Sequence, residues 1–223
     1  MPVAYLCDFD GTIAPTDIGA ALVRRFSVAT PEAQRRRLRQ WMGDELGHRE
    51  LTEAESADLR VSAEDALAFV RAFRLDPGFE PFVREARGRG DAVMVVSEGF
   101  DFYIRELLER AGLGDLPRAA NGAAFEEGGL RPEFPYAGEG CGRCGNCKAP
   151  HVRRYQALGY RAVFVGDGLS DRCGARAADE VMARGSLLRW CRETGLEALP
   201  FESFTDVADR ARRLAAGAAP GRG

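Results

Sequence analysis

Two aspartates separated by one residue follow the first apolar run of the chain. They are Asp8 and Asp10, in the sequence CDFDGT. At a strand end both carboxyl groups can face one crevice, where one attacks phosphorus and the other gives a proton to the leaving alkoxide and later takes one from water. The pair therefore predicts phosphoryl transfer, with Asp8 as nucleophile and Asp10 as acid and base. The structural alternative is a turn that caps a helix.

Five other residues at the expected strand ends are candidate phosphate contacts. Gly11 would let backbone N–H groups approach a phosphate closely, and the hydroxyl groups of Thr12 and Ser97 could donate to its oxygen atoms. Glu98 and Gly99 follow Ser97 directly and are placed in the same loop, where Glu98 could instead cap a helix.

Several acids in one site would repel each other and a phosphate dianion, so a cation is needed. Asp8, the carbonyl group of Asp10 and Asp167 form an oxygen ligand set for Mg²⁺, with Asp171 as an orienting neighbour. Lys148, the only lysine in the chain, is assigned to neutralise the nucleophile and the transferred group.

The elements that must position these residues alternate between strands and helices. Continuous apolar runs at 3–7, 92–96, 162–165 and 180–183 are typical of strands buried on both faces. Each is followed by a helical pattern, which predicts an α/β, Rossmann-like, doubly wound parallel sheet. Ligands bind at the carboxyl ends of such strands.

The spacing of the runs also predicts the domain organisation. Residues 1–15 and 79–214 form the Rossmann-like catalytic core, and residues 16–78 read as a helical cap inserted after the first strand. The Gly- and Pro-rich stretch 119–147 could hold a hairpin around 127–129, and residues 215–223 read as a disordered tail.

Composition excludes several other classes. The formal net charge of −3 leaves no electrostatic footprint for nucleic acid, and no stretch reaches the ~20 apolar residues that a membrane span requires. The first residues enter a strand at once, without a leader, so we expect a cytoplasmic protein with reduced thiols. The expected partner is a small phosphorylated metabolite.

The four segments CDFDGT, VVSEG, CK and GDGLSD, in this order, resemble the four motifs of the haloacid dehalogenase superfamily of phosphatases. The resemblance covers the whole chain and implies a Mg²⁺-dependent phosphatase with an aspartyl-phosphate intermediate. The helical insertion after the first motif resembles the cap of the phosphoserine-phosphatase-like branch.

A finer resemblance is to the methionine-salvage phosphatases that act on 2-hydroxy-3-keto-5-methylthiopentenyl-1-phosphate. It rests on CGRCGNCK and ARGSLLRWCRETGLEALPFESF. In phosphoserine phosphatases an acid soon after the first motif and a cap arginine hold the substrate. Asp17 fits the first position, but the cap segment RELTEAESADLR is acidic and Arg60 is distant in sequence, so phosphoserine is the weaker alternative.

Cys141, Cys144 and Cys147, with His151 four residues on, have the spacing of a Cys₃His zinc site. A structural zinc, a redox-sensitive pair and plain thiols all remain open. Three rival functions remain as well. They are a phosphotransferase or mutase with the same phosphoenzyme, a receiver-like phospho-acceptor, and a zinc-binding interaction module.

Overall fold

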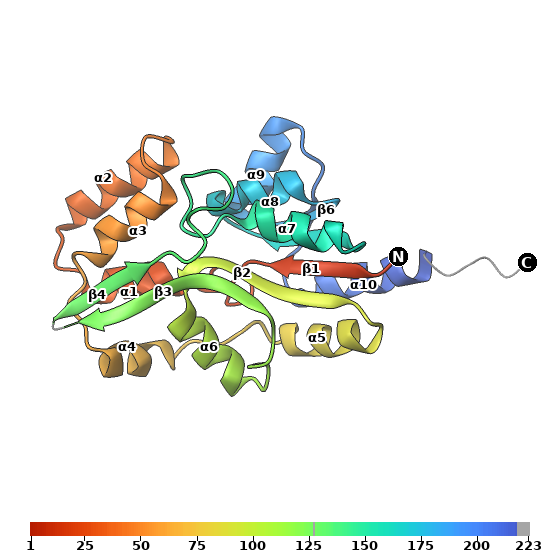
Figure 1. Cartoon of the computed structure of the whole chain (residues 1–223), viewed down its shortest axis with the longest axis horizontal. Coiled ribbons are helices and arrows are strands. Elements are labelled where there is room, and N and C mark those ends of the chain that lie inside the picture. The colour runs from red at the N-terminus through yellow and green to blue at the C-terminus, as the bar shows by residue number, and fades with distance from the viewer. Residues whose placement is uncertain (127, 218–223) are drawn as a thin grey trace, which may run out of the picture.

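A mostly parallel sheet runs through the computed structural model, which describes residues 1–126 and 128–217 (Figure 1). Its strand order is β4-β3-β2-β1-β5-β6-β7, and all neighbours are parallel except β3 and β4. This confirms the predicted α/β doubly wound sheet. The strands are β1 (Val3–Cys7), β2 (Ala92–Phe100), β3 (Arg118–Glu126), β4 (Gly129–Glu133), β5 (Arg161–Gly166), β6 (Glu180–Ala183) and β7 (Leu199–Pro200).

Helices cover both faces of the sheet because β1 is apolar on both sides. Tyr5 and Cys7 belong to the hydrophobic cluster on one face, and Ala4 and Leu6 to the cluster on the other. Figure 1 shows α5, α6 and α10 below the sheet and α7, α8 and α9 above it. These core helices are α5 (Phe79–Gly88), α6 (Asp101–Arg110), α7 (Lys148–Ala157), α8 (Arg172–Ala177), α9 (Gly185–Thr194) and α10 (Phe204–Gly217), and a 3₁₀ turn spans Leu169–Asp171.

Four helices occupy the predicted cap. Their starts follow the expected capping chemistry, since side chains of Asp17, Thr30 and Ser62 accept from the first-turn N–H groups of the helices that follow. Figure 1 shows α2 and α3 above the β3–β4 hairpin, on the side toward which the arrow of β1 points. The helices are α1 (Ile18–Phe26), α2 (Pro31–Met42), α3 (His48–Ser56) and α4 (Ala63–Val70).

The cap helices share one hydrophobic core with the sheet and do not form a core of their own. Ile18 and Leu22 of α1 and Val70 of α4 belong to the same hydrophobic cluster as Tyr5 of β1. The division into a cap at 16–78 and a core therefore stays a prediction.

The structure describes most of the predicted hairpin and the first residues of the predicted tail. The expected hairpin is the antiparallel pair β3 and β4, in which Glu126 pairs with Gly129, and residue 127 lies outside the described residues. The predicted tail is wrong at residues 215–217, because α10 continues to Gly217 through helix-favouring alanines. Residues 218–223 lie outside the described part.

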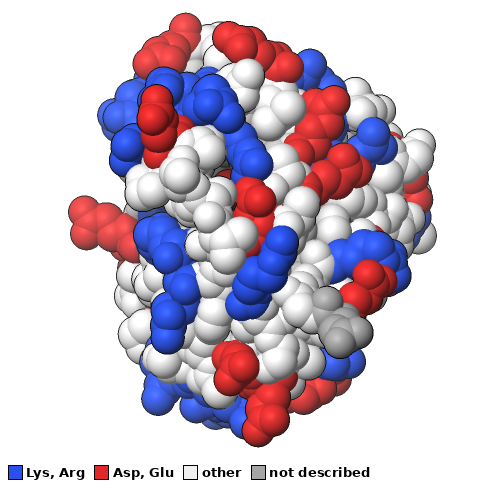
Figure 2. All heavy atoms as spheres, turned by 90° about the vertical axis from the view of Figure 1, so that its left-hand side faces the viewer, with Lys and Arg blue, Asp and Glu red and all other residues white. Residues whose placement is uncertain are grey.

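Figure 2 turns the end of the molecule with α2, α3 and the β3–β4 hairpin toward the viewer. Basic and acidic side chains alternate over this face, so neither sign of charge dominates it. Among the described residues, no helix combines the length and the apolar character that crossing a bilayer requires.

Candidate active site

The carboxyl ends of β1, β2 and β5 meet at one edge of the sheet, because these three strands are parallel neighbours. Asp8 directly follows β1, Ser97 lies in the last half of β2, and Asp167 directly follows β5. A cavity of about 460 Å³ opens there, between this edge and the cap helices α1, α2 and α3. The topology thus brings the separated segments CDFDGT, VVSEG and GDGLSD to one site.

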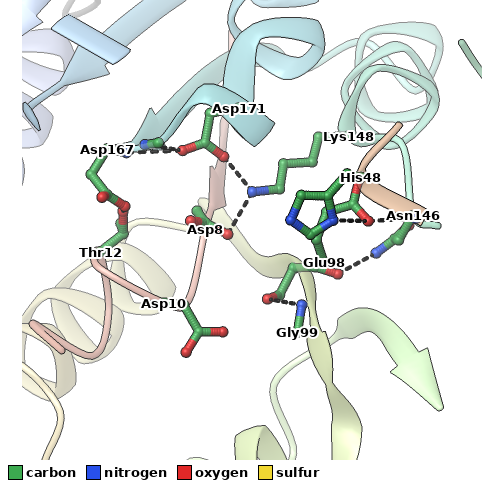
Figure 3. Close-up of polar contacts among 12 residues, drawn as sticks. Asp8, Asp10, Thr12, His48, Glu98, Gly99, Asn146, Lys148, Asp167 and Asp171 are labelled. Atoms are coloured by element: carbon green, nitrogen blue, oxygen red, sulfur yellow. Dashed lines mark hydrogen bonds and ion pairs between the residues drawn. The ribbon is translucent and has the colours of Figure 1, made fainter. Parts of the chain in front are cut away.

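Lys148 joins two of the aspartates. Its Nζ atom donates to Oδ1 of Asp8 at 2.5 Å and also to Oδ1 of Asp171 (Figure 3). The lysine is only 1% exposed, and Asp8 and Asp171 are also buried. Burial works against the ammonium form, but the carboxylates of Asp171 and Asp8 hold the pKa of Lys148 above its usual range. Lys148 is therefore a permanent cation at the site.

The carboxyl group of Asp10 is held separately from this ion pair. Its Oδ1 accepts from the backbone N–H of Ile18 at 2.8 Å, and its Oδ2 accepts from the hydroxyl group of Tyr103 at 2.5 Å. Although the residue keeps partial exposure to the cavity, desolvation of its carboxyl group, followed by the charge of Asp17, raises the Asp10 pKa to about 7. A group with this pKa can both give and take a proton near neutral pH.

Three acids gather around Lys148 and give the site an excess of negative charge. Carboxylate oxygens of Asp8, Asp167 and Asp171 lie within 4.8 Å of one another. Burial and then the charge of Asp171 raise the pKa of Asp167 to about 6, and burial also raises that of Asp8. When all three acids are ionised, they and Lys148 together carry a charge of −2. Hard oxygen donors and this charge fit a divalent cation such as Mg²⁺.

Asp171 is already fully used in orienting other groups. Its Oδ1 accepts from Lys148, and its Oδ2 accepts from the backbone N–H groups of Asp167 and Gly168, each at 2.9 Å. Asp8 and Asp167 are therefore the carboxylates left to face a cation.

Thr12 and two glycines position the acids of the site. The hydroxyl group of Thr12 donates to Oδ1 of Asp167 at 2.8 Å, so the structure shows it orienting that acid and not free to contact a phosphate. Gly11 has a φ of 79°, and a Cβ atom there would collide with the Asp167 carboxylate. A Cβ atom at Gly99 would collide with the bonded Asp10–Tyr103 pair.

Ser97 and Glu98 have different environments. Ser97 lines the cavity, and its Oγ accepts from the N–H of Gly99 at 2.9 Å, which leaves its own proton for a ligand. Glu98 differs from its predicted role as a phosphate contact. Its Oε2 accepts from the N–H groups of Gly145 and Asn146 and lies 3.3 Å from Nδ1 of His48, because a buried carboxylate needs donors around it.

His48 is the first functional candidate that sequence reasoning missed. It begins α3 of the cap, and its Nδ1 atom forms an ion pair with Glu98 of β2 without a hydrogen bond (Figure 3). Burial opposes its protonation, but the charge of Glu98 raises the pKa of His48 above its usual value. A lone histidine in a cap helix carries no sequence signal for a partner 50 residues away.

Asn146 and His151 form a second structural link near Lys148. The Nδ2 atom of Asn146 donates to the carbonyl oxygens of Ser97 at 2.8 Å and Ala119 at 2.9 Å, and its Oδ1 accepts from Nε2 of His151 at 2.8 Å. His151 also packs edge-on against Tyr136. This engagement contradicts the predicted Cys₃His zinc set, because the fourth group beside Cys141, Cys144 and Cys147 is Cys173.

Arg184 and Tyr103 are further residues that the sequence did not single out. Arg184 donates from Nε to the carbonyl oxygen of Gly11 at 2.9 Å and from Nη2 to that of Thr12 at 3.2 Å. It thus holds the loop after β1 in place. The contacts of these two residues with Gly11 and Asp10 depend on the folded chain.

The cap side of the cavity combines apolar and polar side chains. Leu22, Leu51, Leu59 and Trp41 line it, together with the polar residues Asp17, Arg24, Gln34, Arg35, Thr52 and Glu55. Asp17 caps α1 through the N–H of Ala20 and faces the cavity, as its predicted position requires. Burial raises the pKa of Glu55 to about 7.

Known proteins are similar to this chain in sequence and in fold. The family model for haloacid dehalogenase-like hydrolase matches residues 5–176. The 2-hydroxy-3-keto-5-methylthiopentenyl-1-phosphate phosphatase of Geobacillus kaustophilus is 35% identical over 216 residues, which cover 95% of this chain and 96% of that protein. The enzyme of the same name from Brevibacillus brevis is 33% identical over 208 residues, which cover 92% and 93%.

A solved structure of a substrate-bound phosphoserine phosphatase has a TM-score of 0.73, with 20% identity, and the match covers 94% of this chain and 98% of that one. At this identity the likeness concerns the fold alone. The family match spans most of the chain and includes Asp8, Ser97, Lys148 and Asp167. The protein therefore belongs to the haloacid dehalogenase-like hydrolases.

Proposed function

We propose that this protein hydrolyses a small phosphomonoester by way of a phosphorylated Asp8. The observation that carries the proposal is the buried contact of Lys148 with Asp8, beside a separate Asp10 whose pKa is about 7. Asp8 is thus paired with a buried cation, and Asp10 can exchange a proton. Two carboxyl groups in such different environments suit a nucleophile and an acid-base partner.

In the first step a carboxylate oxygen of Asp8 attacks phosphorus and the ester P–O bond breaks. Asp10, protonated, gives its proton to the leaving alkoxide. In the second step Asp10 takes a proton from water, the resulting hydroxide attacks phosphorus, and the bond between Asp8 and phosphorus breaks to release inorganic phosphate. Lys148 stabilises the charge on the phosphoryl group, and Ser97 donates its hydroxyl proton to one of the oxygens.

Mg²⁺ is the proposed cofactor, held by Asp8, Asp167 and the carbonyl oxygen of Asp10. When bound, it offsets the charge of the phosphate dianion and of the acids around it. Thr12 and Asp171 keep Asp167 and its loop in position for this role. Zinc, the second metal considered from sequence, has no part in these steps, and the cytoplasmic location stays a prediction.

The substrate we propose is the methionine-salvage type named for the relatives, a phosphate ester with an uncharged chain that ends in a methylthio group. Support comes from the apolar side chains on the cap side of the cavity, among them the buried residues Leu22, Leu51 and Leu59. Asp17 and Glu55 offer acceptors for hydroxyl groups, and Arg24 and Arg35 line the same side of the cavity. Phosphoserine, which carries a carboxylate, is the weaker candidate.

Turnover of Asp8→Asn tests the mechanism. We expect the variant to fold but to lose Mg²⁺-dependent phosphate release, and to show no phosphoryl adduct by rapid-quench mass spectrometry where the wild type does. Asp115→Asn, which alters an exposed aspartate, is the matched control. Retained turnover in Asp8→Asn would overturn the mechanism.

A substrate panel tests specificity and separates hydrolysis from transfer. We expect kcat/KM for 2-hydroxy-3-keto-5-methylthiopentenyl-1-phosphate to exceed that for phosphoserine at least about 10-fold, because apolar contacts discriminate by this order. Adding an alcohol acceptor should leave inorganic phosphate as the main product. A phosphorylated acceptor as the main product would instead identify a phosphotransferase or mutase, and a stable phosphoprotein with negligible turnover a receiver-like module.

A further inference from the structure

Four cysteine sulfurs converge beside the active site. Cys141, Cys144 and Cys147 come from the segment before α7, and Cys173 comes from α8. Their Sγ atoms all lie within 4.8 Å of one another, and those of Cys141 and Cys144 are 3.4 Å apart. A tetrahedral zinc site with Zn–S distances of about 2.3 Å requires sulfurs about 3.8 Å apart. We propose that these four residues hold one structural Zn²⁺ ion.

The backbone around the four cysteines has features of a metal-binding loop. Residues 134–147 contain no helix or strand, and Gly140 and Gly142 have φ values of 87° and 74°. A Cβ atom on Gly140 would collide with Sγ of Cys147, so the chain passes close to this sulfur only because the residue is glycine. Cys147 precedes α7 without capping it through its side chain, which leaves the sulfur free for a metal.

Exposure and charge fit the same assignment. Cys141 is exposed, Cys144 and Cys173 are half-buried and Cys147 is buried, so an ion can reach the cluster from solvent. Binding of Zn²⁺ releases the thiol protons and leaves four thiolates with a net charge of −2. Arg143 and Arg172 are sequence neighbours of the ligands, which places positive charge on both ligand-bearing segments.

The position of the cluster indicates what the ion would do. Lys148 directly follows Cys147, and Asp171 lies two residues before Cys173. A metal would tie together the two segments that carry the Lys148–Asp171 ion pair. The same loop reaches the cap, because Arg143 and Arg172 both donate to Asp44 in the turn between α2 and α3.

Metal analysis of the reduced, purified protein tests this site, whatever the substrate of the enzyme. We expect about one zinc ion per chain after dialysis against zinc-free buffer. Replacement by Co²⁺ should give the intense visible absorption and thiolate charge-transfer bands of a tetrahedral four-thiolate site. Removing the ion with a chelator should lower the unfolding temperature.

Three variants separate the alternatives. Cys173→Ser should lose the zinc, whereas His151→Asn should keep it, and Cys191→Ser is the matched control because Cys191 is a buried cysteine outside the cluster. The proposal fails if reduced wild-type protein holds no zinc, if an intact-mass shift shows a disulfide instead, or if His151→Asn loses the ion and Cys173→Ser keeps it. The cobalt spectrum of the wild type decides the number of sulfur ligands even if a variant does not fold.

Discussion

The hydroxyl group of Tyr103 donates to Oδ2 of Asp10 across 2.5 Å, from the first turn of α6 to the loop after β1. This bond favours the carboxylate and so opposes the desolvation that raises the Asp10 pKa. Tyr103→Phe should therefore raise the Asp10 pKa further, by about one unit, because a hydrogen bond contributes about 1 kcal/mol.

The pH profile of turnover measures this effect. The limb that belongs to Asp10 should move to higher pH in Tyr103→Phe, and Tyr155→Phe, which alters a tyrosine of α7 outside the cavity lining, should leave it in place. An unchanged profile in Tyr103→Phe would remove Tyr103 from the acid-base machinery.

Lys148→Arg should abolish turnover although it keeps the charge. Lys148 is buried between Asp8 and Asp171, and a planar guanidinium is too wide for a space shaped around a single ammonium group. We expect kcat to fall by about 10³-fold or more, since the position of the stabilising charge is lost. Steady-state kinetics with circular dichroism as a folding check measures this, and near-normal kcat would show that charge alone is needed.

The Asp10 pKa also predicts how stability depends on pH. A carboxyl group with a raised pKa in the folded state binds a proton more tightly there than in the unfolded chain, so its contribution to stability falls as pH rises from about 4 to about 7. Without Mg²⁺, the unfolding free energy of the wild type minus that of Asp10→Asn should decrease across this window. Each unit of pKa shift corresponds to about 1.4 kcal/mol.

Asp206 provides a control of opposite sign. Backbone N–H groups of Glu202 and Ser203 lower its pKa, so its contribution is present above its usual pKa of 3.8 and is lost as pH falls below that value. Denaturant unfolding at several pH values compares Asp206→Asn with Asp10→Asn. Parallel curves for the two variants would contradict the assigned direction of the Asp10 shift.

His48→Gln should weaken the contact between the cap and the core. The ion pair of His48 with Glu98 joins α3 to β2 at the edge of the cavity, so its loss should raise KM by about 5-fold or more while kcat changes less. Because Glu98 raises the His48 pKa, the effect should be full below pH 6.5 and should fade as pH rises through the folded-state pKa.

Arg49→Gln is the matched control for this prediction. Arg49 lies next to His48 on α3 and pairs with Glu53 at 3.7 Å, but both side chains of that pair are well exposed. Such a surface pair contributes little, so KM should stay within about 2-fold of the wild type. Equal effects of the two substitutions would indicate general damage to α3 and not a specific contact.

Local patterns in the sequence predict the reaction class and the parallel sheet that carries the site. Continuous apolar runs such as 3–7 predict strands buried on both faces, and a parallel sheet collects the residues after those strands at one edge. Asp8, Asp10 and Asp167 were found in this way, and Lys148 through its uniqueness in an arginine-rich chain. These signals are local, because each depends on a short segment and its neighbours.

Which groups face each other depends instead on how the chain folds. The pairs Tyr103–Asp10 and His48–Glu98 join residues 93 and 50 positions apart, and no periodicity in the chain encodes such a contact. The same is true of the cysteine cluster, where spacing suggested His151 but packing directs that ring to Asn146 and brings Cys173 from α8. Buried polar groups take the partners that the packed chain leaves within reach, and that choice exists only after folding.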